Sequence, residues 1–434
     1  LSETLYLSSF FRLSYDFAGK YFITANFRKD GNSALGEENK YGNFGGVSAG
    51  WSLSEESFYK NSKLSEVVNA LKLKGSWGKV GNGNLSSSYA SLNLFSSSIY
   101  GTAPTWALSQ AGNSALGWET SEQTNVGLEA GLWNDRLQFT ADYFNNNVNG
   151  LILSSPQSPS KGLPNNAILA NVGSMYNRGI ELGLSGSLIR SEDFQWKASI
   201  NYTHVKNKVT ALAEGNSDII GYTQTTTEAN NVTRVGYSAG SLYGAVTDGV
   251  NPDNGRRIFI NRNGEKVQYS AAVGSGQSNW TYLDGSTAAA ITVADYQVLG
   301  NALPTWYGGL TNTFQYKAFD LSVNFTYSGG NKVMNGTRGT LLDQRFYNNS
   351  TEALDRWTTP GQVTAVPRLV YNDVISNGSS GFSISDNAEK ADFLRLQQLV
   401  LGYSLPKKLL SKIDVSGLRV YAQASNLFLL TGYT

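Results

Sequence analysis

Residues 308–330 read GGLTNTFQYKAFDLSVNFTYSGG, and they decide the fold. From Phe319 onward apolar and polar side chains alternate without an error; the apolar positions are Phe319, Leu321, Val323, Phe325 and Tyr327. A period of two is that of a β-strand with one apolar and one polar face. The alternation leaves two possibilities open: the apolar face fills the inside of a soluble sandwich, or it faces lipid.

The composition is that of a β protein with few charges. Aromatic residues make up 12 % of the 434 residues and charged residues only 15 %, against about 25 % charged residues in ordinary soluble domains. The net charge of +1 gives no field that would attract nucleic acid. The chain has no Cys and one His, so disulfides and thiolate metal sites are excluded, His-based catalysis is nearly excluded, and we expect no cofactor.

Hydropathy does not indicate a membrane helix. No apolar run approaches the roughly 18 residues of a spanning helix, and mean hydropathy is −0.28. Hydropathy plots are nearly blind to membrane β-barrels, whose apolar residues come at every second position. Residues 1–15 show neither the basic start nor the apolar core of a signal peptide, so we expect the printed sequence to begin inside a longer chain.

Twelve alternating runs are predicted to be strands, many of them about twice as long as strands in soluble proteins. The runs are 5–16, 21–30, 43–53, 71–80, 118–133, 136–150, 171–188, 195–207, the two arms of 308–330, 393–406 and 418–430. Short connections, at 16–20, 54–70, 133–136, 189–194, 316–319 and 405–416, alternate with long ones, at 30–42, 81–117, 154–170, 213–303 and 330–391. In an antiparallel meander all short turns then share one rim, which is the pattern of outer-membrane barrels. We therefore expect an all-β transmembrane antiparallel up-and-down β-barrel, whose closure would also remove open strand edges.

The two faces of such a barrel carry different side chains. Tryptophans at strand ends predict a membrane girdle, since an amphipathic ring suits a lipid–water boundary: Trp51, Trp133 and Trp196 come near short turns, and Trp118 and Trp306 near long loops. Polar residues in mid-strand predict a wet lumen; they are Asp142, Asn146, Asn201, Thr203, Asp320 and Asn324. In a soluble sandwich the same tryptophans would be core residues and the same polar residues would face bulk water.

Sequence motifs give only weak signals for catalysis or metal binding. GxSxG occurs at 46–50 and 236–240, but no helical pattern follows either copy, and the single His204 is expected on the polar face of a strand. The segments 253–255 and 261–265 faintly resemble calcium loops but have too few ligands, so turns are predicted there. We expect no enzymatic activity and no metal site.

Aromatic residues in the long loops are the remaining candidates for ligand binding. Trp106, Trp280, Tyr282 and Trp357 lie among many Asn, Gln, Ser and Thr residues. A ring that stacks on a sugar face, with side-chain amides for the hydroxyls, is a suitable composition for binding sugars. The alternative, which we favour for each residue, is that these rings pack small cores within the loops.

Ordered blocks of the chain resemble the C-terminal part of the barrel in the SusC/RagA family of TonB-dependent outer-membrane transporters. The most extensive are KYFITANFRKDGNSALGEENKYGNFGGVSAGWSLSEESF (20–58), LGWETSEQTNVGLEAGLWNDRLQFTADYFNNNVNGLI (116–152) and LGNALPTWYGGLTNTFQYKAFDLSVNFTYSGGNKVMN (299–335). Shorter blocks at 71–82, 177–184, 235–250, 356–369, 392–406 and 418–433 match in the same order. The resemblance covers almost the whole chain.

The resemblance implies a 22-stranded barrel in the bacterial outer membrane, in contact with its lipid, with a plug domain in the lumen. It also implies a SusD-like surface lipoprotein as a lid, energy from TonB with ExbB and ExbD, and an oligosaccharide or sometimes a peptide as ligand. Residues 1–434 would be the C-terminal portion of the barrel, and we expect the signal peptide, TonB box, plug, early strands and final strand to lie outside them. Import of oligosaccharides is the predicted function; import of oligopeptides, glycan binding without transport and a surface glycosidase are the alternatives.

Overall fold

The computed structural model describes residues 2–85, 87–222, 229–343, 348–378, 382–406, 410 and 415–433. The chain divides into two compact units. Unit 1 holds residues 1–217, 306–327 and 394–430, and unit 2 holds residues 218–305, 328–393 and 431–434. Among the described residues the regular structure of both units is β-strand with only short helices, which confirms the all-β class.

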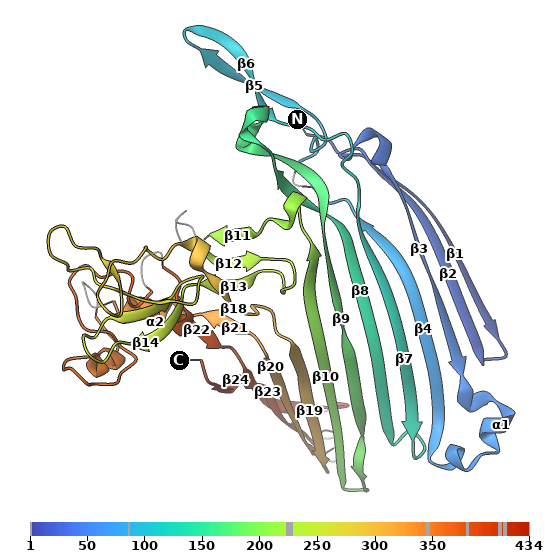
Figure 1. Ribbon diagram of the computed structural model, residues 1–434. Helices are drawn as coiled ribbons and strands as arrows, with labels where there is room; N and C mark the ends of the chain where they lie inside the picture. Colours follow the sequence, from blue (N-terminus) through green and yellow to red (C-terminus); the bar gives the residue numbers. More distant parts are fainter. Residues whose placement is uncertain are drawn as a thin grey trace. The chain divides into compact units, whose positions relative to one another are not determined.

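Unit 1 is based on one sheet of twelve strands, counted over the described residues (Figure 1). The strands lie in the sheet in chain order, and they are β1 (Tyr6–Phe17), β2 (Tyr21–Asn32), β3 (Tyr41–Ser52), β4 (Val68–Asn82), β7 (Glu119–Leu132), β8 (Leu137–Pro156), β9 (Ala167–Arg190), β10 (Phe194–Ala211), β19 (Trp306–Tyr316), β20 (Phe319–Gly329), β23 (Phe393–Ser404) and β24 (Arg419–Thr431). This order confirms the predicted meander of twelve long strands.

Tight turns join β1 to β2, β7 to β8, β9 to β10 and β19 to β20 at one end of the sheet, the lower end in Figure 1. In the first turn Phe17 stands opposite Tyr21, and the side chain of Asp16 accepts a hydrogen bond from the backbone N–H of Gly19 at 2.9 Å. Gly19 has a φ of +65°, and residues 133–135 of the β7–β8 turn are also left-handed. Backbone of this handedness matches the twist of the flanking strands, so these short turns hold the register.

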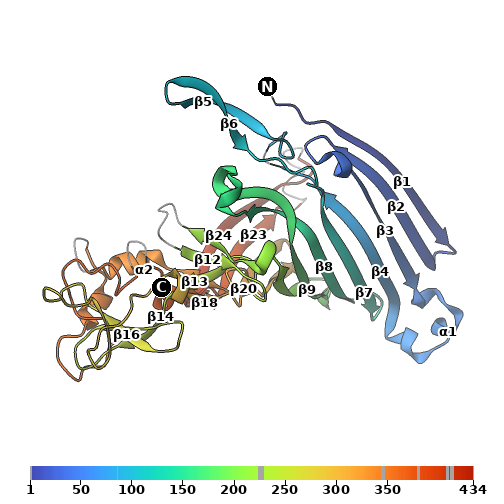
Figure 2. The ribbon, with the colours of Figure 1, turned by 45° about the horizontal axis from the view of Figure 1, so that its top comes forward.

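Two features of unit 1 differ from the prediction. β8 and β9 extend farther than expected, so the loop predicted at 154–170 is reduced to 157–166. A hairpin of β5 (Leu94–Tyr100) and β6 (Ala103–Gln110) stands in the segment 81–117, where no strand was predicted. This hairpin pairs only with itself and extends beyond the ends of the neighbouring strands (Figures 1 and 2).

Unit 2 corrects the prediction that residues 213–303 are irregular. One sheet contains β11 (Ile219–Tyr222), β12 (Ala229–Thr233), β13 (Ser241–Gly244) and β18 (Gln297–Gly300), and a second contains β14 (Val246–Val250), β15 (Arg257–Ile260), β16 (Lys266–Tyr269) and β17 (Trp280–Tyr282). A third pair is β21 (Lys332–Met334) with β22 (Ala388–Lys390). Strands of three to five residues are too short to show a period of two, which is why the sequence pattern missed them.

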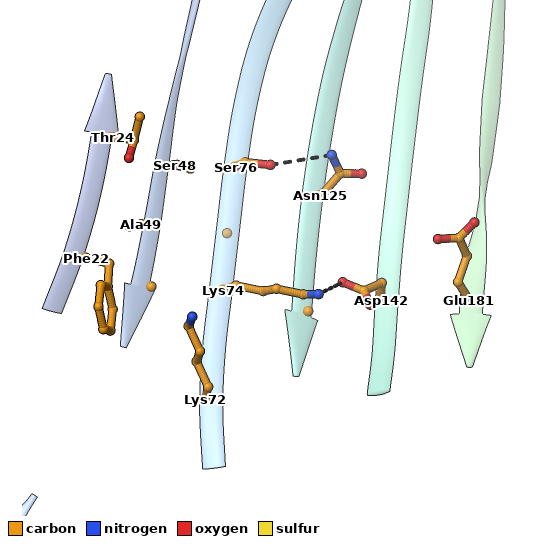
Figure 3. Close-up of a pocket in the computed structure, with 13 residues that line it drawn as sticks. Phe22, Thr24, Ser48, Ala49, Lys72, Lys74, Ser76, Asn125, Asp142 and Glu181 are labelled. Carbon is orange, nitrogen blue, oxygen red and sulfur yellow. Dashed lines mark hydrogen bonds and ion pairs between the residues drawn. The ribbon is translucent and has the colours of Figure 1, made fainter. Parts of the chain in front are cut away.

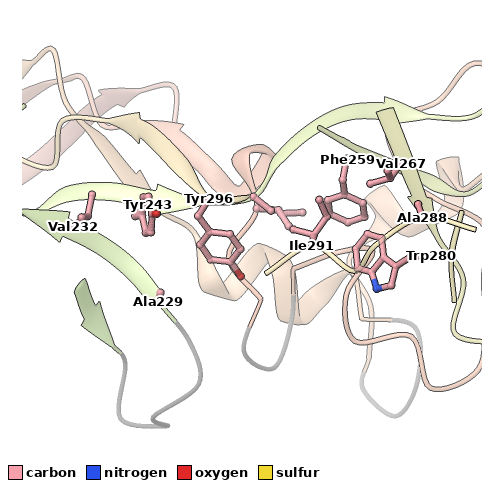
Figure 4. Packing of buried hydrophobic residues seen from close by; sticks show 11 residues of the cluster. Ala229, Val232, Tyr243, Phe259, Val267, Trp280, Ala288, Ile291 and Tyr296 are labelled. Atoms are coloured by element: carbon pink, nitrogen blue, oxygen red, sulfur yellow. The ribbon is translucent and has the colours of Figure 1, made fainter. Parts of the chain in front are cut away.

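The two longest loops, 213–303 and 330–391, both contribute to one hydrophobic core in unit 2 (Figure 4). The ring of Phe259 meets that of Trp280 edge-on with centroids 5.3 Å apart. Ile384, from the second loop, is 1 % exposed, and its backbone forms a parallel bridge with Ala245. The loops are therefore a folded unit with a core of their own.

Helices are short and lie outside the large sheet. They are α1 (Ser57–Lys60), α2 (Gly336–Leu341) and the 3-10 turns η1 (Glu37–Asn39), η2 (Leu53–Glu55), η3 (Lys63–Glu66), η4 (Pro159–Lys161), η5 (Pro164–Asn166), η6 (Glu214–Asn216), η7 (Val293–Asp295), η8 (Thr351–Asp355) and η9 (Ser385–Asn387). The connection 54–70 contains α1, η3 and most of η2, whereas most of the expected connector 405–416 lies outside the described residues. Across the part of the chain that the structure describes, no helix combines the length and the apolar character needed to span a bilayer.

Candidate functional site

The register of the large sheet divides its side chains between two faces. Lys74 stands opposite Gly127, Gly127 opposite Asp142, and Asp142 opposite Glu181. Residues that stand opposite each other on neighbouring strands point to the same side of a sheet. These side chains therefore share one face, which we call the polar face; the other is the apolar face.

An ion network lies at the centre of the polar face (Figure 3). The ammonium of Lys74 is 3.0 Å from carboxylate oxygens of both Glu129 and Asp142. Gly127 makes room for this contact, since a Cβ there would lie 2.1 Å from Asp142. Lys74 and Asp142 line a hollow of about 540 Å³ together with Ser76 and Asn125, which are hydrogen-bonded to each other at 3.4 Å. Charges paired in this way present a hydrated surface that can pass or hold a polar molecule.

Two further residues predicted to face the lumen are tied to their neighbours on the polar face. The side-chain oxygen of Asn201 accepts a hydrogen bond from the backbone of Gly309 at 2.5 Å. Both oxygens of Asp320 accept hydrogen bonds from Arg419, at 2.9 and 2.5 Å. Asn324 follows Asp320 on the same strand at an even spacing, so alternation puts it on the same face. That this face lines a lumen stays a prediction.

Aromatic rings gather on the apolar face near the short turns. The rings of Tyr15, Phe17, Tyr21 and Trp51 stack in sequence across β1, β2 and β3, with successive centroids 6.4–6.5 Å apart. Farther along the sheet the ring of Trp196 stacks on that of Phe314 at 5.6 Å. Trp51 and Trp196 thus each lie in a group of stacked rings on the apolar face near the short turns, and a girdle of such rings stays a prediction.

The other three predicted girdle residues have different surroundings. Trp306 lies 6.2 Å from the ring of Tyr327, and Trp133 is exposed in the β7–β8 turn. Trp118 instead packs edge-on against the buried Phe44 at 5.3 Å, and its indole N–H donates to the backbone of Lys40. Trp118 therefore supports a small core near the long loops, and we leave it out of the proposed girdle.

One carboxylate that the sequence analysis did not single out ties a connector to the aromatic row. Glu56, between β3 and β4, accepts hydrogen bonds from the hydroxyl of Tyr21 at 2.5 Å, from Lys20 at 3.0 Å and from the indole of Trp51 at 3.2 Å. The bond from Tyr21, followed by those from Lys20 and Trp51, lowers the pKa of Glu56. The resemblance block 20–58 contains all four residues, so the block itself was the available signal.

The prediction that His204 lies on the polar face was wrong. His204 stands opposite Ile180 on β9 and opposite Trp306 on β19, in an uninterrupted register. Its neighbour Thr203 stands opposite Glu181, which is on the polar face. Alternation therefore puts His204 on the apolar face, the side that carries Tyr202.

The loop aromatics do not converge on one site. Trp280 is 7 % exposed and belongs to the core of unit 2, and Tyr282 packs against that core. Trp357 donates its indole N–H to the backbone of Pro252 at 2.8 Å, whereas Trp106, on the β5–β6 hairpin, is 75 % exposed. Packing within the loops accounts for Trp280, and a ligand contact stays a proposal for the exposed and half-buried rings.

The weak motifs have structural explanations. Residues 46–50 lie within β3, and residues 236–240 lie between β12 and β13 with no helix directly after them. In 261–265 the side-chain oxygen of Asn261 accepts hydrogen bonds from the backbone N–H groups of Asn263 and Glu265, at 3.0 and 2.9 Å. Both calcium-like segments contain a left-handed glycine, Gly255 or Gly264, as turns of this kind require.

Known proteins are similar to this chain in fold and in sequence. A family model described as TonB dependent receptor-like, beta-barrel, matches residues 2–246. TonB-dependent receptor P39 of Formosa agariphila is 32 % identical over 98 % of this chain and 43 % of its own length, and TonB-dependent receptor SusC of Bacteroides thetaiotaomicron is 28 % identical over 98 % and 40 %. The solved structure of the RagAB peptide transporter superposes with a TM-score of 0.78 at 27 % identity, covering 100 % of this chain and 45 % of that one; the RagAB peptide importer in its open-open state gives 0.81 at 26 %, covering 99 % and 44 %.

The family model matches more than half of the chain, so the chain belongs to the TonB-dependent receptor-like β-barrel family. It is of the SusC/RagA type, as the ordered blocks predicted, and is part of an outer-membrane β-barrel rather than an enzyme. The chain spans less than half the length of the curated relatives that it matches.

Proposed function

We propose that the complete protein imports oligosaccharides across the outer membrane. A SusD-like lipoprotein would close over the long loops, and the TonB–ExbB–ExbD system would supply the energy. The observation that carries the proposal is the division of the sheet into a polar face with the Lys74 network and an apolar face with aromatic rows. A sheet of this kind, curved into a barrel, encloses a polar path and presents lipid with an apolar surface.

The folded loops supply the means of capture. Unit 2 has its own hydrophobic core, so its loops form a folded scaffold for a binding surface. A ligand held there between loops and lid would pass down the polar face once the plug moves. The hydroxyl, amide and paired ionic groups of that face offer weak, exchangeable hydrogen bonds, which let a hydrated molecule pass without being trapped.

Import of oligopeptides is the second candidate. It is favoured by one observation, the extensive superposition on structures described as the RagAB peptide transporter and peptide importer. Both candidates use the same barrel and lid, so only the ligand distinguishes them.

Calorimetric titration of the full-length protein with its lid lipoprotein tests the proposal. Defined oligosaccharides and oligopeptides of equal length are titrated in parallel. Heat of binding from oligosaccharides is the expected result. Binding of peptides alone would replace the first candidate with the second.

A further inference from the structure

The second sheet of unit 2 also has a polar face, on which Gln268 and Ser270 are themselves buried. Val267 and Trp280 point from it into the core. Gln268 stands opposite Thr281 on the other side of the sheet, and alternation adds Ser270 to that side. Hydroxyl and amide groups therefore cover the face that turns away from the core.

Two arginines lie over this surface although they are 112 positions apart in the chain (368 − 256). The guanidinium of Arg256 donates to the hydroxyl of Thr281 at 3.4 Å, and that of Arg368 donates to the hydroxyl of Ser270 at 3.2 Å. A backbone hydrogen bond from Arg368 to Gly255, at 2.9 Å, fixes Arg368 beside the residue that precedes Arg256.

Within the part of the chain that the structure describes, the two arginines form no ion pair. Other arginines of unit 2 have one: Arg257 pairs with Asp386 and Arg234 with Asp218, each at 2.5 Å. For Arg256 and Arg368 no carboxylate partner exists among the described residues, and the Nε atom of each is buried without a hydrogen bond. Burial, and after it the like charge of Arg368, lowers the pKa of Arg256. The fold thus holds two neighbouring guanidinium groups together, which costs stability, and the Nε–H donor of each makes no hydrogen bond.

An aromatic ring lies next to the pair. Gly255 has a φ of +72°, and a Cβ on it would lie 2.4 Å from the ring of Trp357 and 2.9 Å from the Cβ of Arg368. Trp357 and Arg368 therefore pack on the same glycine. The half-buried ring is adjacent to the unpaired charges, and it was one of the candidate rings for ligand binding.

We propose that Arg256 and Arg368 bind a carboxylate or sulfate group of an acidic oligosaccharide. Guanidinium groups match the geometry of such oxoanions with two parallel hydrogen bonds. Thr281 adds a hydroxyl group, and Trp357 offers a surface for the sugar ring that bears the anion. The inference rests on the proposed function and names its substrate class.

The experiment uses the full-length protein with its lid lipoprotein and three probes of equal length: tetragalacturonate, neutral cellotetraose and a tetraglutamate peptide. Arg256→Met and Arg368→Met remove the charge and keep most of the side-chain volume. Arg262→Met is the matched control, because Arg262 is an exposed arginine in the β15–β16 turn of the same sheet. Affinities are measured by calorimetric titration, and the folding of each variant is checked by its melting temperature.

Each test variant should bind tetragalacturonate about tenfold more weakly than the unchanged protein, while its affinity for cellotetraose and the behaviour of the control stay the same. Unchanged affinity for tetragalacturonate, or equal losses for the acidic and neutral sugars, would overturn the assignment. A loss of affinity for tetraglutamate alone would show that the anion belongs to a peptide and not to a sugar.

A second measurement separates this inference from the proposed function. Inorganic sulfate should protect Arg256 and Arg368, but not Arg262, from modification by phenylglyoxal, as read by peptide mass spectrometry. If no oligosaccharide binds but sulfate protects the pair, the import of oligosaccharides fails and the oxoanion site stands. Absence of protection refutes the site itself.

Discussion

A charge placed at Val323 tests which face of the sheet meets lipid. β20 runs for 11 residues, Phe319–Gly329, which is about 36 Å at roughly 3.3 Å per residue. A tilt of about 40° reduces this to about 28 Å, enough to cross an apolar band of about 25 Å. Val323 is the fifth residue of the strand, within about one residue of its middle.

Val323→Arg should therefore destabilise the folded protein by about 2–4 kcal/mol, the cost of a basic side chain near the bilayer midplane. Asn324→Arg is the matched control. It adds the same charge one position along, on the face that Asp320 shares, and should change stability by no more than about 0.5 kcal/mol.

Unfolding by urea in lipid vesicles measures both variants, with tryptophan fluorescence for the transition and the heat-dependent gel shift for the folded fraction. The full-length protein is used, so that the barrel can close. Equal stability of the two variants would refute the assignment of faces, and so would a greater loss for Asn324→Arg.

Three further predictions follow from single contacts. Gly308→Ala should cost about 1–3 kcal/mol in the same urea assay, because its Cβ would lie 2.1 Å from a backbone oxygen of β10, whereas Gly75→Ala, with its nearest atom at 3.9 Å, should be tolerated; equal effects would contradict the register. Because the pKa of Glu56 is lowered in the folded state, the contribution of this carboxylate to stability is present above the ordinary value of 4.5 and is lost as pH falls below it. Melting temperatures of the original protein and of Glu56→Gln, measured between about pH 3 and pH 6, should therefore differ at the upper end and converge at the acid end. Two parallel curves would contradict this prediction. Trp280→Ala should destabilise unit 2 by about 3–5 kcal/mol and speed its cleavage by protease, whereas Trp106→Ala, which changes an exposed ring, should do neither. Equal resistance to protease in both variants would show that Trp280 is not a core residue.

The large sheet was predictable because its constraints are local. A strand between lipid and water repeats every two residues, and Asp142 and Asp320 could be placed on one face by counting. The error at His204 was one of counting, because His204 has the same parity as Ile200 and Tyr202, and its partners Ile180 and Trp306 confirm that it lies on the apolar face.

The loops were not predictable in the same way. Their strands are too short for a period, and their core depends on contacts between distant segments, such as Ala245 with Ile384. Arg256 and Arg368 belong to different loops, so no spacing in the sequence reveals the pair. The sequence placed Glu56 only within a resemblance block. Its role became clear from its three hydrogen-bond donors in the structure.

The shared core of the two longest loops bears on the order of assembly. Thr247 and Ser385 are hydrogen-bonded at 2.9 Å across 138 positions of the chain, and the β19–β20 hairpin lies between them in sequence. Closing so long a loop is entropically costly and slow, so this core forms late. It is complete only when the second loop lies beside the first, because Ile384 belongs to it. A hairpin stalled on the wrong side would leave Phe259 and Trp280 uncovered, and such an intermediate is a natural target for the chaperones and proteases that monitor barrel assembly.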